Sequence, residues 1–323
     1  MTSYLIGIDG GGTSCRAAVA DTEGRILGRA KSGPANILTD PETALKNIAD
    51  SARGAFEDGG LDPAGIAAAY AIVGVAGQNV GDAVLDVGRR LPFAAAEIES
   101  DGLIALEGAV GDMDGAVAIL GTGAIYIARR GDAERTIGGW GFTIGDHGSG
   151  ARIGHALLQE TLLAYDGIHA ASAVTESVLS EFNNDPRRLV DFARLAKPGE
   201  FGRYAPRIFE FAEGGDPVSV RLLKSSAAMV DEALDALVLK EARRICLLGG
   251  LAPLYRPWLA DRHQPLFVEA KADALTGAVA LATRRFGHRP RGMTWPTRSP
   301  VSCCQKGFDQ EAQGRFISGF GNS

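Results

Sequence analysis

Hydrophobic and polar positions in the first third of the chain form short apolar runs separated by segments with helical spacing. The run at residues 4–9 is apolar up to its last position, which is typical of a buried strand. The segment 41–59 places Leu45, Ile48 and Phe56 on one helical face. The pattern predicts strands at 4–9, 16–20, 25–31, 67–75 and 97–100, and helices at 41–59, 80–91 and 102–110.

The pattern starts again after the loop at residues 111–115. A strand, a glycine-rich turn and a second strand occur near the start of both halves, which indicates a weak internal duplication. Long helical segments then follow. The predicted strands are 116–120, 124–130, 136–144, 244–248 and 266–268, and the predicted helices are 153–165, 170–182, 218–239 and 274–286.

The order of elements predicts an α/β protein with two ribonuclease-H-like domains, each a mixed sheet with helices packed on it. A chain of 323 residues is long enough for two domains. We expect an N-terminal domain at 1–113, completed by the helix at 274–286, and a C-terminal domain at 114–273. Residues 287–323 have no sustained apolar period and are predicted to be a flexible tail.

A run of three glycines and a threonine, Gly10-Gly11-Gly12-Thr13, directly follows the first strand and its last residue, Asp9. Glycines let backbone N–H groups approach phosphate oxygens without obstruction by a Cβ, and the threonine adds a hydroxyl donor. Asp9 suits Mg²⁺, because hard cations prefer carboxylate oxygens. A plain hairpin turn needs fewer glycines and no acid, so the pattern favours a phosphate loop.

Two common nucleotide-binding motifs are excluded. The dipeptide Gly-Lys, which a P-loop requires, does not occur in this chain. The dinucleotide pattern G-x-G-x-x-G is broken because Cys15 stands where its third glycine belongs. The phosphates would therefore contact a turn between two strands.

Two further glycine motifs lie in the second half. Gly121-Thr122-Gly123 repeats the turn between two strands, and together the two turns would hold a triphosphate in a nucleotide cleft between the domains. Gly249-Gly250 ends a strand where an adenine could lie against the backbone, although a simple strand-to-helix turn explains the pair equally well.

The composition limits which binding partners and which cellular compartment are expected. There are 39 acidic and 33 basic side chains and the pI is about 5.5, which argues against a nucleic acid or an anionic membrane as partner. Four cysteines without metal-ligand spacing favour a reducing compartment. The N-terminus lacks a basic region before its apolar run, and no apolar stretch is long enough to span a membrane. We expect a soluble, cytoplasmic protein.

These glycine motifs, in this order, resemble those of the actin, heat-shock chaperone and sugar-kinase superfamily. More narrowly, the chain is similar over about residues 4–286 to the BadF/BadG/BcrA/BcrD ATPase family, and within it to N-acetylglucosamine and glucosamine kinases. The narrower resemblance rests on the motifs at 33–36, 74–77, 100–101, 138–141 and 145–149.

The resemblance implies an actin-like ATPase fold that uses ATP and Mg²⁺ to phosphorylate the 6-hydroxyl of N-acetylglucosamine or glucosamine. It also implies a homodimer. Asp101 matches the catalytic base, Asn36 and Asp146 match groups that bind ring hydroxyls, and Gly139 and Trp140 match the sugar pocket. A carboxylate, an amide and an aromatic face are also what a polyhydroxylated ring requires physically.

Each of these side chains also has a purely structural explanation. Asp101 would cap the helix that follows it, and Asn36 would serve a turn after Pro34. Trp140 would be ordinary core, although the glycines around it leave it little packing, and Asp146 would satisfy loop N–H groups.

Two other activities are alternatives to the sugar kinase. An ATPase that activates a radical dehydratase needs cysteines for an iron–sulfur cluster, and Cys15, Cys246, Cys303 and Cys304 form no such set. A nucleotide-dependent binding switch needs no sugar pocket and leaves the pocket residues unexplained. The nitrogen of the sugar stays open: Glu107, Asp146 and Gly139 could serve a free amine or an acetamido group, and only the resemblance ranks N-acetylglucosamine first.

Overall fold

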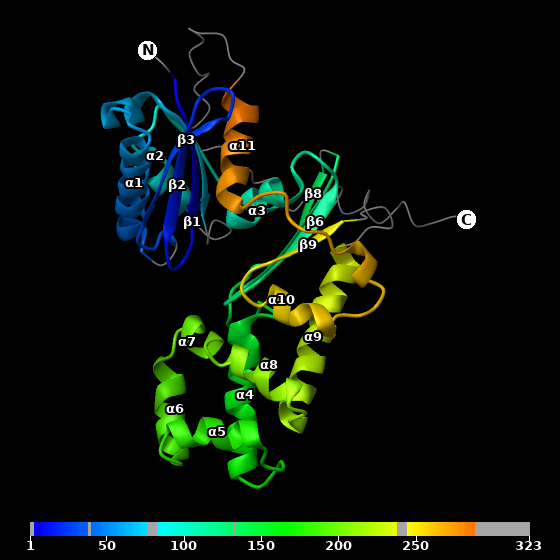
Figure 1. Cartoon of the computed structure of the whole chain (residues 1–323). Coiled ribbons are helices and arrows are strands. Elements are labelled where there is room, and N and C mark those ends of the chain that lie inside the picture. Colours follow the sequence, from blue (N-terminus) through cyan, green and yellow to red (C-terminus); the bar gives the residue numbers. More distant parts are fainter. Residues whose placement is uncertain (1–2, 38–39, 76–82, 132, 238–243, 288–323) are drawn as a thin grey trace, which may run out of the picture. The chain divides into compact units, whose positions relative to one another are not determined.

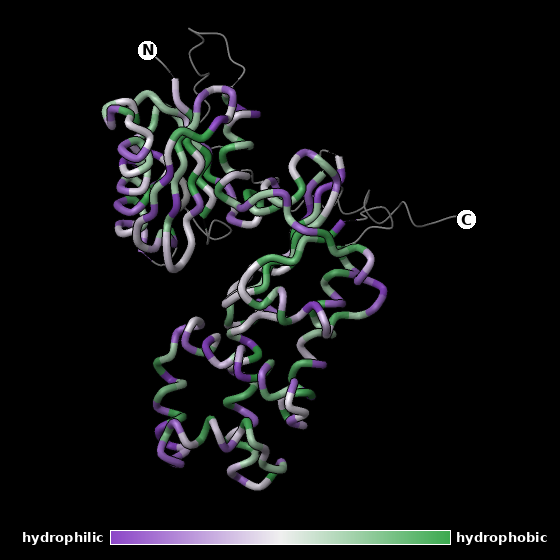
Figure 2. Tube along the Cα trace, viewed as in Figure 1, coloured by the Kyte–Doolittle hydropathy of each residue, from purple (hydrophilic) through white to green (hydrophobic). Residues whose placement is uncertain are grey.

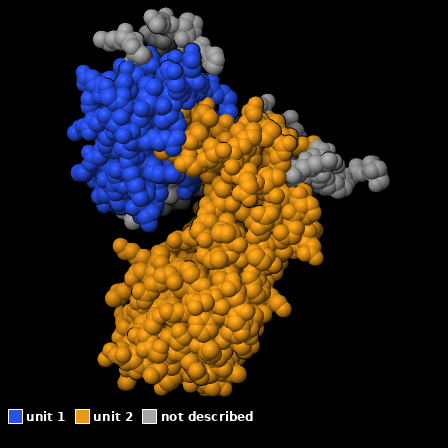
Figure 3. All heavy atoms as spheres, in the orientation of Figure 1, with its two compact units in different colours: residues 1–101, 281–323 blue, residues 102–280 orange. Residues whose placement is uncertain are grey.

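The computed structural model describes residues 3–37, 40–75, 83–131, 133–237 and 244–287. They divide into two compact units: residues up to 101 together with those from 281 onward, and residues 102–280 (Figure 3). Each unit contains one sheet, as the two predicted α/β halves require. The predicted tail from 288 onward lies outside the described residues.

The first unit is built on a five-stranded mixed sheet in the order β3-β2-β1-β4-β5. Figure 1 labels β1, β2 and β3 of this sheet. β1 pairs antiparallel with β2 and parallel with β4, and β4 pairs parallel with β5. The three strands that carry the predicted site therefore end at one edge of the sheet. The strands are β1 (Leu5–Gly10), β2 (Cys15–Ala20), β3 (Ile26–Ser32), β4 (Tyr70–Val75) and β5 (Ala95–Ser100).

The helix α1 (Pro41–Asp58) forms where the sequence predicts it. Asp40 caps it by accepting a hydrogen bond from the N–H of Thr43 at 3.0 Å, and Pro41 occupies the first turn. Polar and apolar positions alternate along it (Figure 2), and its buried face includes Ile48 and Phe56. The other elements of this unit are the 3₁₀ helix η1 (Pro63–Ala68) and α2 (Ala83–Arg90); α3 (Asp101–Val110) begins at its boundary and continues into the second unit.

The second unit has a four-stranded sheet in the order β8-β7-β6-β9. The third strand predicted for this half is present, but its predicted bounds, 136–144, are wrong. β8 ends at Gly138, because φ angles of +79° at Gly138 and +73° at Gly139 leave the extended region. The predicted strand at 266–268 is also wrong, since only an isolated bridge joins Phe267 to Ile245. The strands are β6 (Gly115–Leu120), β7 (Ala124–Arg130), β8 (Ala133–Gly138) and β9 (Ile245–Leu248).

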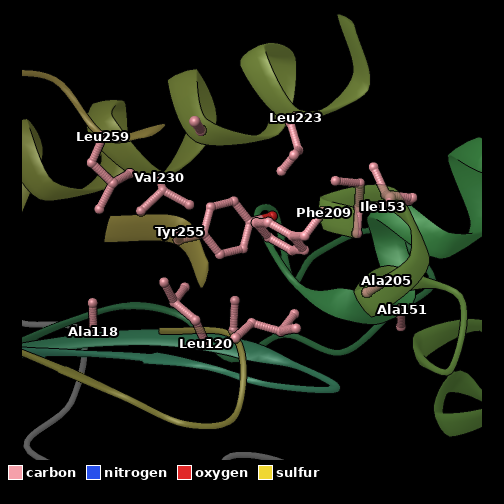
Figure 4. Close-up of a cluster of buried hydrophobic side chains, with 14 of the residues drawn as sticks. Ala118, Leu120, Ala151, Ile153, Ala205, Phe209, Leu223, Val230, Tyr255 and Leu259 are labelled. Atoms are coloured by element: carbon pink, nitrogen blue, oxygen red, sulfur yellow. The ribbon is translucent and has the colours of Figure 1, made fainter. Parts of the chain in front are cut away.

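The core of the second unit lies between this sheet and its helices. Leu120 of β6 points toward Tyr255 and Phe209, and Val230 and Leu223 of α9 close the cluster from the other side (Figure 4). The helices α6 and α8 were not predicted from the sequence; in α6 Leu189 is buried, and Phe192 and Ala193 are partly buried against the core. The helices are α4 (Gly150–Tyr165), α5 (Ala173–Glu181), α6 (Pro186–Leu195), α7 (Pro198–Gly202), α8 (Ala205–Glu213), α9 (Pro217–Leu237), α10 (Ala252–Tyr255), η2 (Arg256–Trp258), η3 (Gln264–Leu266) and α11 (Ala274–Phe286).

The helix α11 has the bounds that the sequence predicts. The division between the compact units falls after Asp101, the first residue of α3, whereas the expected domain boundary falls after the whole helix. The domain assignment therefore stays a prediction. Residues 76–82, which include the end of the 74–77 motif and the start of the predicted helix at 80–91, lie outside the described residues.

Candidate functional site

The first glycine turn is a tight hairpin between β1 and β2. The N–H of Gly11 donates to the carbonyl of Ser14 at 2.9 Å, and the carbonyl of Gly11 accepts from the N–H of Ala35 at 2.9 Å. A Cβ at Gly10 would lie 2.9 Å from Val75 Cγ1, so packing alone requires this glycine. A Cβ at Gly12 would meet nothing within 4 Å. The exposed tip of the turn is thus the part that is open to a phosphate.

Asp9 is paired with Arg16, a residue that the sequence analysis did not single out. The hairpin register places the two opposite each other, and Asp9 Oδ2 accepts hydrogen bonds from Arg16 Nε at 3.1 Å and Nη2 at 2.5 Å. The Asp9 side chain keeps 19% of its surface exposed. One accessible carboxylate beside a phosphate turn suits Mg²⁺, which usually takes one or two carboxylates together with substrate phosphates and water.

Asp101 and the first glycine turn lie at the same edge of the sheet. Gly10 pairs with Val75, and Val75 pairs with Ser100, the residue before Asp101. Two strand spacings separate them, which is about 10 Å. Asp101 is the partly buried first residue of α3, where the helix dipole favours a carboxylate anion. The carboxyl ends of parallel strands are where α/β proteins bind ligands.

Asn36 is held next to the same turn. It follows Ala35, whose N–H contacts Gly11, and it is partly buried. Its backbone carbonyl accepts a hydrogen bond from the N–H of Asp40 at 3.2 Å. The backbone of Asn36 therefore forms the turn that its structural explanation predicts. Its side chain is still a candidate for binding the sugar.

The second glycine turn, between β6 and β7, is anchored to the start of α4. The carbonyl of Gly121 accepts from the N–H of Gly150 at 2.8 Å, and that of Thr122 accepts from the N–H of Ala151 at 3.2 Å. The first N–H groups of α4 are consequently occupied by the turn itself. Thr122 and Gly123 are exposed, so here too a phosphate would meet a turn and no helix N-terminus.

The glycine pair after β9 lies against the end of β6. Gly249 has a φ of +91°, and a Cβ there would lie 2.4 Å from the carbonyl oxygen of Leu120. The N–H of Leu251 donates to that same oxygen at 3.0 Å. Gly250 has open space around it. The structure thereby brings the predicted adenosine segment beside the second glycine turn.

Asp146 is buried against the second turn, with 9% of its surface exposed and a positive φ of +56°. Its Oδ1 accepts a hydrogen bond from the N–H of Gly141 at 3.2 Å, and its Oδ2 lies 3.0 Å from the position of a Cβ at Gly123. Burial raises the pKa of this carboxyl, and the N–H of Gly141 partly offsets the rise. The arrangement ties the loop at 138–146 to the phosphate turn.

Trp140 is not a core residue. It stands between glycines at 138, 139 and 141 that all have positive φ angles, and 63% of its surface is exposed. The N–H of Gly139 still bonds the carbonyl of Ala124 at 3.1 Å, so the loop that carries Trp140 is fixed to β7. An indole held this way can cover a ligand.

Glu107, a candidate partner for a sugar amine, is used inside the protein. It is 3% exposed, and its Oε2 lies 2.7 Å from Arg129 Nη2. Arg129 also donates to the carbonyl of Gly111 at 2.7 Å. The buried ion pair of Glu107 with Arg129 is part of the folded core, because separating the two side chains would leave a buried charge without its partner.

The cysteines of the described residues are buried in the fold and form no metal-binding group. Cys15 and Cys246 are buried, and burial raises the pKa of the Cys15 thiol to about 11, whereas Cys303 and Cys304 lie outside the described residues. Among the described residues, no three His, Cys, Asp or Glu side chains are grouped so that they could hold a metal ion.

None of the helices in the described part of the chain combines the length and apolar character needed to cross a bilayer.

Comparison with known proteins gives consistent matches. The model of the BadF/BadG/BcrA/BcrD ATPase family matches residues 6–282. Glucosamine kinase GspK of Vibrio cholerae is 38% identical over 281 residues, which cover 87% of this chain and 96% of that protein. N-acetyl-D-glucosamine kinase of Dictyostelium discoideum is 28% identical, over 73% of this chain and 79% of its own. A crystal structure from Chromobacterium violaceum superposes with a TM-score of 0.78 at 31% identity, covering 86% of this chain and 98% of the other.

Proposed function

The chain belongs to the BadF/BadG/BcrA/BcrD ATPase family, and from this premise we propose that it is an ATP-dependent amino-sugar kinase. The observation that carries the proposal is the placement of Asp101 at the same sheet edge as the first glycine turn. A phosphate turn and a carboxylate about two strands apart match the needs of phosphoryl transfer to a hydroxyl. The glucosamine and N-acetylglucosamine kinases among the relatives support an amino sugar as acceptor.

ATP binds through the exposed tips of the two glycine turns and the glycine pair. Gly11, Gly12 and Thr13 of the first turn and Thr122 of the second present backbone N–H groups and hydroxyls to the phosphates. Gly250 leaves space for the adenosine. Gly10 and Gly249 are required by packing. In the second turn a Cβ at Gly121 would meet nothing within 4 Å, so this glycine leaves the backbone open to the phosphates, whereas a Cβ at Gly123 would lie 3.0 Å from Asp146 Oδ2.

Mg²⁺ would be held by Asp9, directly or through water. The metal supplies charge neutralisation on the phosphates. Arg16 fixes the orientation of the Asp9 carboxylate by binding one of its two oxygens.

Asp101 accepts the proton of the sugar 6-hydroxyl as that oxygen attacks the γ-phosphorus in line. One positioned carboxylate suffices, because most of the catalysis in phosphoryl transfer is orientation and charge neutralisation. Asn36 and Asp146 hold ring hydroxyls, while Trp140 and the backbone of Gly139 form the wall of the sugar site. The proposal also includes a cytoplasmic location, which rests on the composition, and a homodimer, which rests on the family resemblance.

The test is an ADP-release assay with Mg·ATP and, in separate reactions, N-acetylglucosamine, glucosamine, glucose and N-acetylmannosamine, with a reaction without sugar as control. We expect one amino sugar to raise ADP release strongly above the control. ADP release that no sugar changes would refute the kinase and favour an activator ATPase or a nucleotide-dependent switch. Because Glu107 is committed to Arg129, preference for glucosamine would direct attention to Asp146 as the partner of the amine.

A further inference from the structure

One helix, α11, contacts both segments that flank Asp101. We propose that Arg285 and Gly277 of α11 are positioning residues, which set the place of the Asp101 carboxylate without touching substrate. The inference rests on the proposed function, because it assigns Asp101 to the chemical step. Its evidence comes from the strand before Asp101 and from the helix that begins with it.

Arg285 fixes the strand before Asp101. Its Nη1 binds the carboxylates of both Glu97 and Glu99, which lie on one face of β5 because they are two residues apart. Glu99 is 2% exposed. The end of α11 is also held by the ring of Phe286, which stacks on Tyr70 with centroids 5.6 Å apart. Removing the guanidinium would leave two carboxylates without their shared cation, two and four residues from Asp101.

Gly277 fixes the helix after Asp101. A Cβ at this position would lie 2.1 Å from the carbonyl oxygen of Ile104 and 2.4 Å from the N of Gly108, both in α3. The segment before α11 is also hydrogen-bonded to α3: the N–H of Ala272 donates to the carbonyl of Gly108 at 2.9 Å. The two backbones thus touch, and any side chain at Gly277 would displace α3 between Ile104 and Gly108.

These contacts explain how a carboxylate at the junction of a strand and a helix is kept in one place. The strand is held through Arg285 and the helix through Gly277, so Asp101 has little freedom to move with either. Phosphoryl transfer depends on this, since a misplacement of about 1 Å can cost about 100-fold in rate. Nucleotide and sugar affinity do not depend on it, because neither α11 residue belongs to a binding segment.

The experiment measures kcat and both KM values of Arg285→Gln and Gly277→Ala, with kcat expressed per folded molecule from the unfolding signal. The expected result is a fall in kcat of about 10- to 100-fold for each variant, with the KM values for ATP and sugar within about twofold of wild type. Arg262→Gln, which breaks the exposed pair with Asp235, and Gly199→Ala, which has open space, are the matched controls and should keep the wild-type kcat.

A further variant separates positioning from stability. Replacing Glu97 and Glu99 by Gln together with Arg285→Gln removes the two negative charges that Arg285 neutralises and should restore the melting temperature, while kcat stays low. The conservative Arg285→Lys should recover part of kcat. The inference is overturned if kcat per folded molecule equals that of wild type in both Arg285→Gln and Gly277→Ala. It is also overturned if the variant with all three substitutions recovers its kcat fully together with its melting temperature. Wild-type protein without sugar-dependent ADP release would instead refute the proposed function itself.

Discussion

Asp9 and Arg16 face each other across the first hairpin, with two donors of the guanidinium on the single oxygen Oδ2. The pair is partly exposed, at 19% for the Asp9 side chain and 38% for Arg16. In the proposed site, Mg²⁺ at Asp9 would share the carboxylate with this second positive charge. We therefore expect the pairing to weaken the binding of free Mg²⁺ before the nucleotide arrives.

The first prediction concerns that sharing. Arg16→Ala should lower the Mg²⁺ concentration that gives half-maximal rate several-fold, because repulsion by the guanidinium is removed. Asp9→Asn should raise it, because the ligand is lost. A titration of Mg²⁺ at fixed ATP measures both, and Lys46→Ala, which breaks an exposed pair with Asp50, is the control that should change neither. A higher Mg²⁺ requirement in Arg16→Ala would instead place Arg16 on the phosphates.

The second prediction concerns the base. Asp101→Asn should reduce kcat by at least about 100-fold, because the amide cannot accept the proton of the sugar hydroxyl. Sugar binding should be nearly unchanged, which isothermal titration in the presence of a non-hydrolysable ATP analogue would measure. Substantial residual kcat would remove Asp101 from the chemical step and leave it as the acidic first residue of α3.

The third prediction concerns the exposed indole. Trp140→Ala should raise KM for the sugar about tenfold or more and leave KM for ATP and the melting temperature nearly unchanged, because 63% of the side chain is exposed and little packing is lost. Tyr165→Ala, an aromatic at the end of α4 that is 55% exposed, is the control for removing a surface ring. Equal effects on both KM values would show that Trp140 supports the whole loop.

The fourth prediction separates two neighbouring glycines. Gly249→Ala should destabilise the protein by about 2 kcal/mol or more, because its φ is +91° and its Cβ would meet the Leu120 carbonyl. Gly250→Ala should leave the melting temperature unchanged and raise KM for ATP, because its Cβ enters open space where the adenosine is proposed to lie. Thermal unfolding and ATP kinetics of the two variants decide the matter. Unchanged ATP kinetics in Gly250→Ala would mean that the adenosine lies elsewhere.

The fifth prediction concerns pH. Burial raises the pKa of Asp146 in the folded protein, so the folded state holds its proton more tightly than the unfolded state does. The stability that protonated Asp146 contributes is therefore lost as pH rises from the unfolded pKa through the folded one. Asp146→Asn should remove that loss, so the stability of the variant relative to wild type should increase as pH rises through this acidic range, and its melting temperature at pH 7 should not be lower. Denaturation curves between about pH 3 and pH 7 test this, and a variant that loses stability mainly toward neutral pH would contradict it.

The fold could be predicted from the sequence because its strongest signals are local. The strand that ends at Gly10, the cap at Asp40 and the period of α11 are each visible within a few residues. The end of β8 was missed because the positive φ angles of Gly138 and Gly139 are not encoded by hydrophobic spacing. α6 was missed because its apolar face is short: Leu189 is buried, and only Phe192 and Ala193 are partly buried beside it against the core.

The site could be predicted in part. The exposure of Trp140 follows from the glycines around it, which leave it little packing. The pairing of Asp9 with Arg16 requires the hairpin register, and the pairing of Glu107 with Arg129 joins residues that are 22 positions apart. The burial of Asp146 against Gly123 likewise depends on how the loop folds back on β7. Such contacts are properties of the folded chain, so a list of motifs cannot contain them.

The most direct test of the central claim is to identify the phosphorylated product. The protein is incubated with Mg·ATP and the amino sugar that raises ADP release most, and the products are analysed by mass spectrometry and ³¹P–¹H correlation NMR. The account predicts one sugar monophosphate for each ADP, with its phosphorus coupled to the two protons on C6. Unmodified sugar together with one inorganic phosphate for each ADP would contradict it, because the phosphoryl group would then have gone to water.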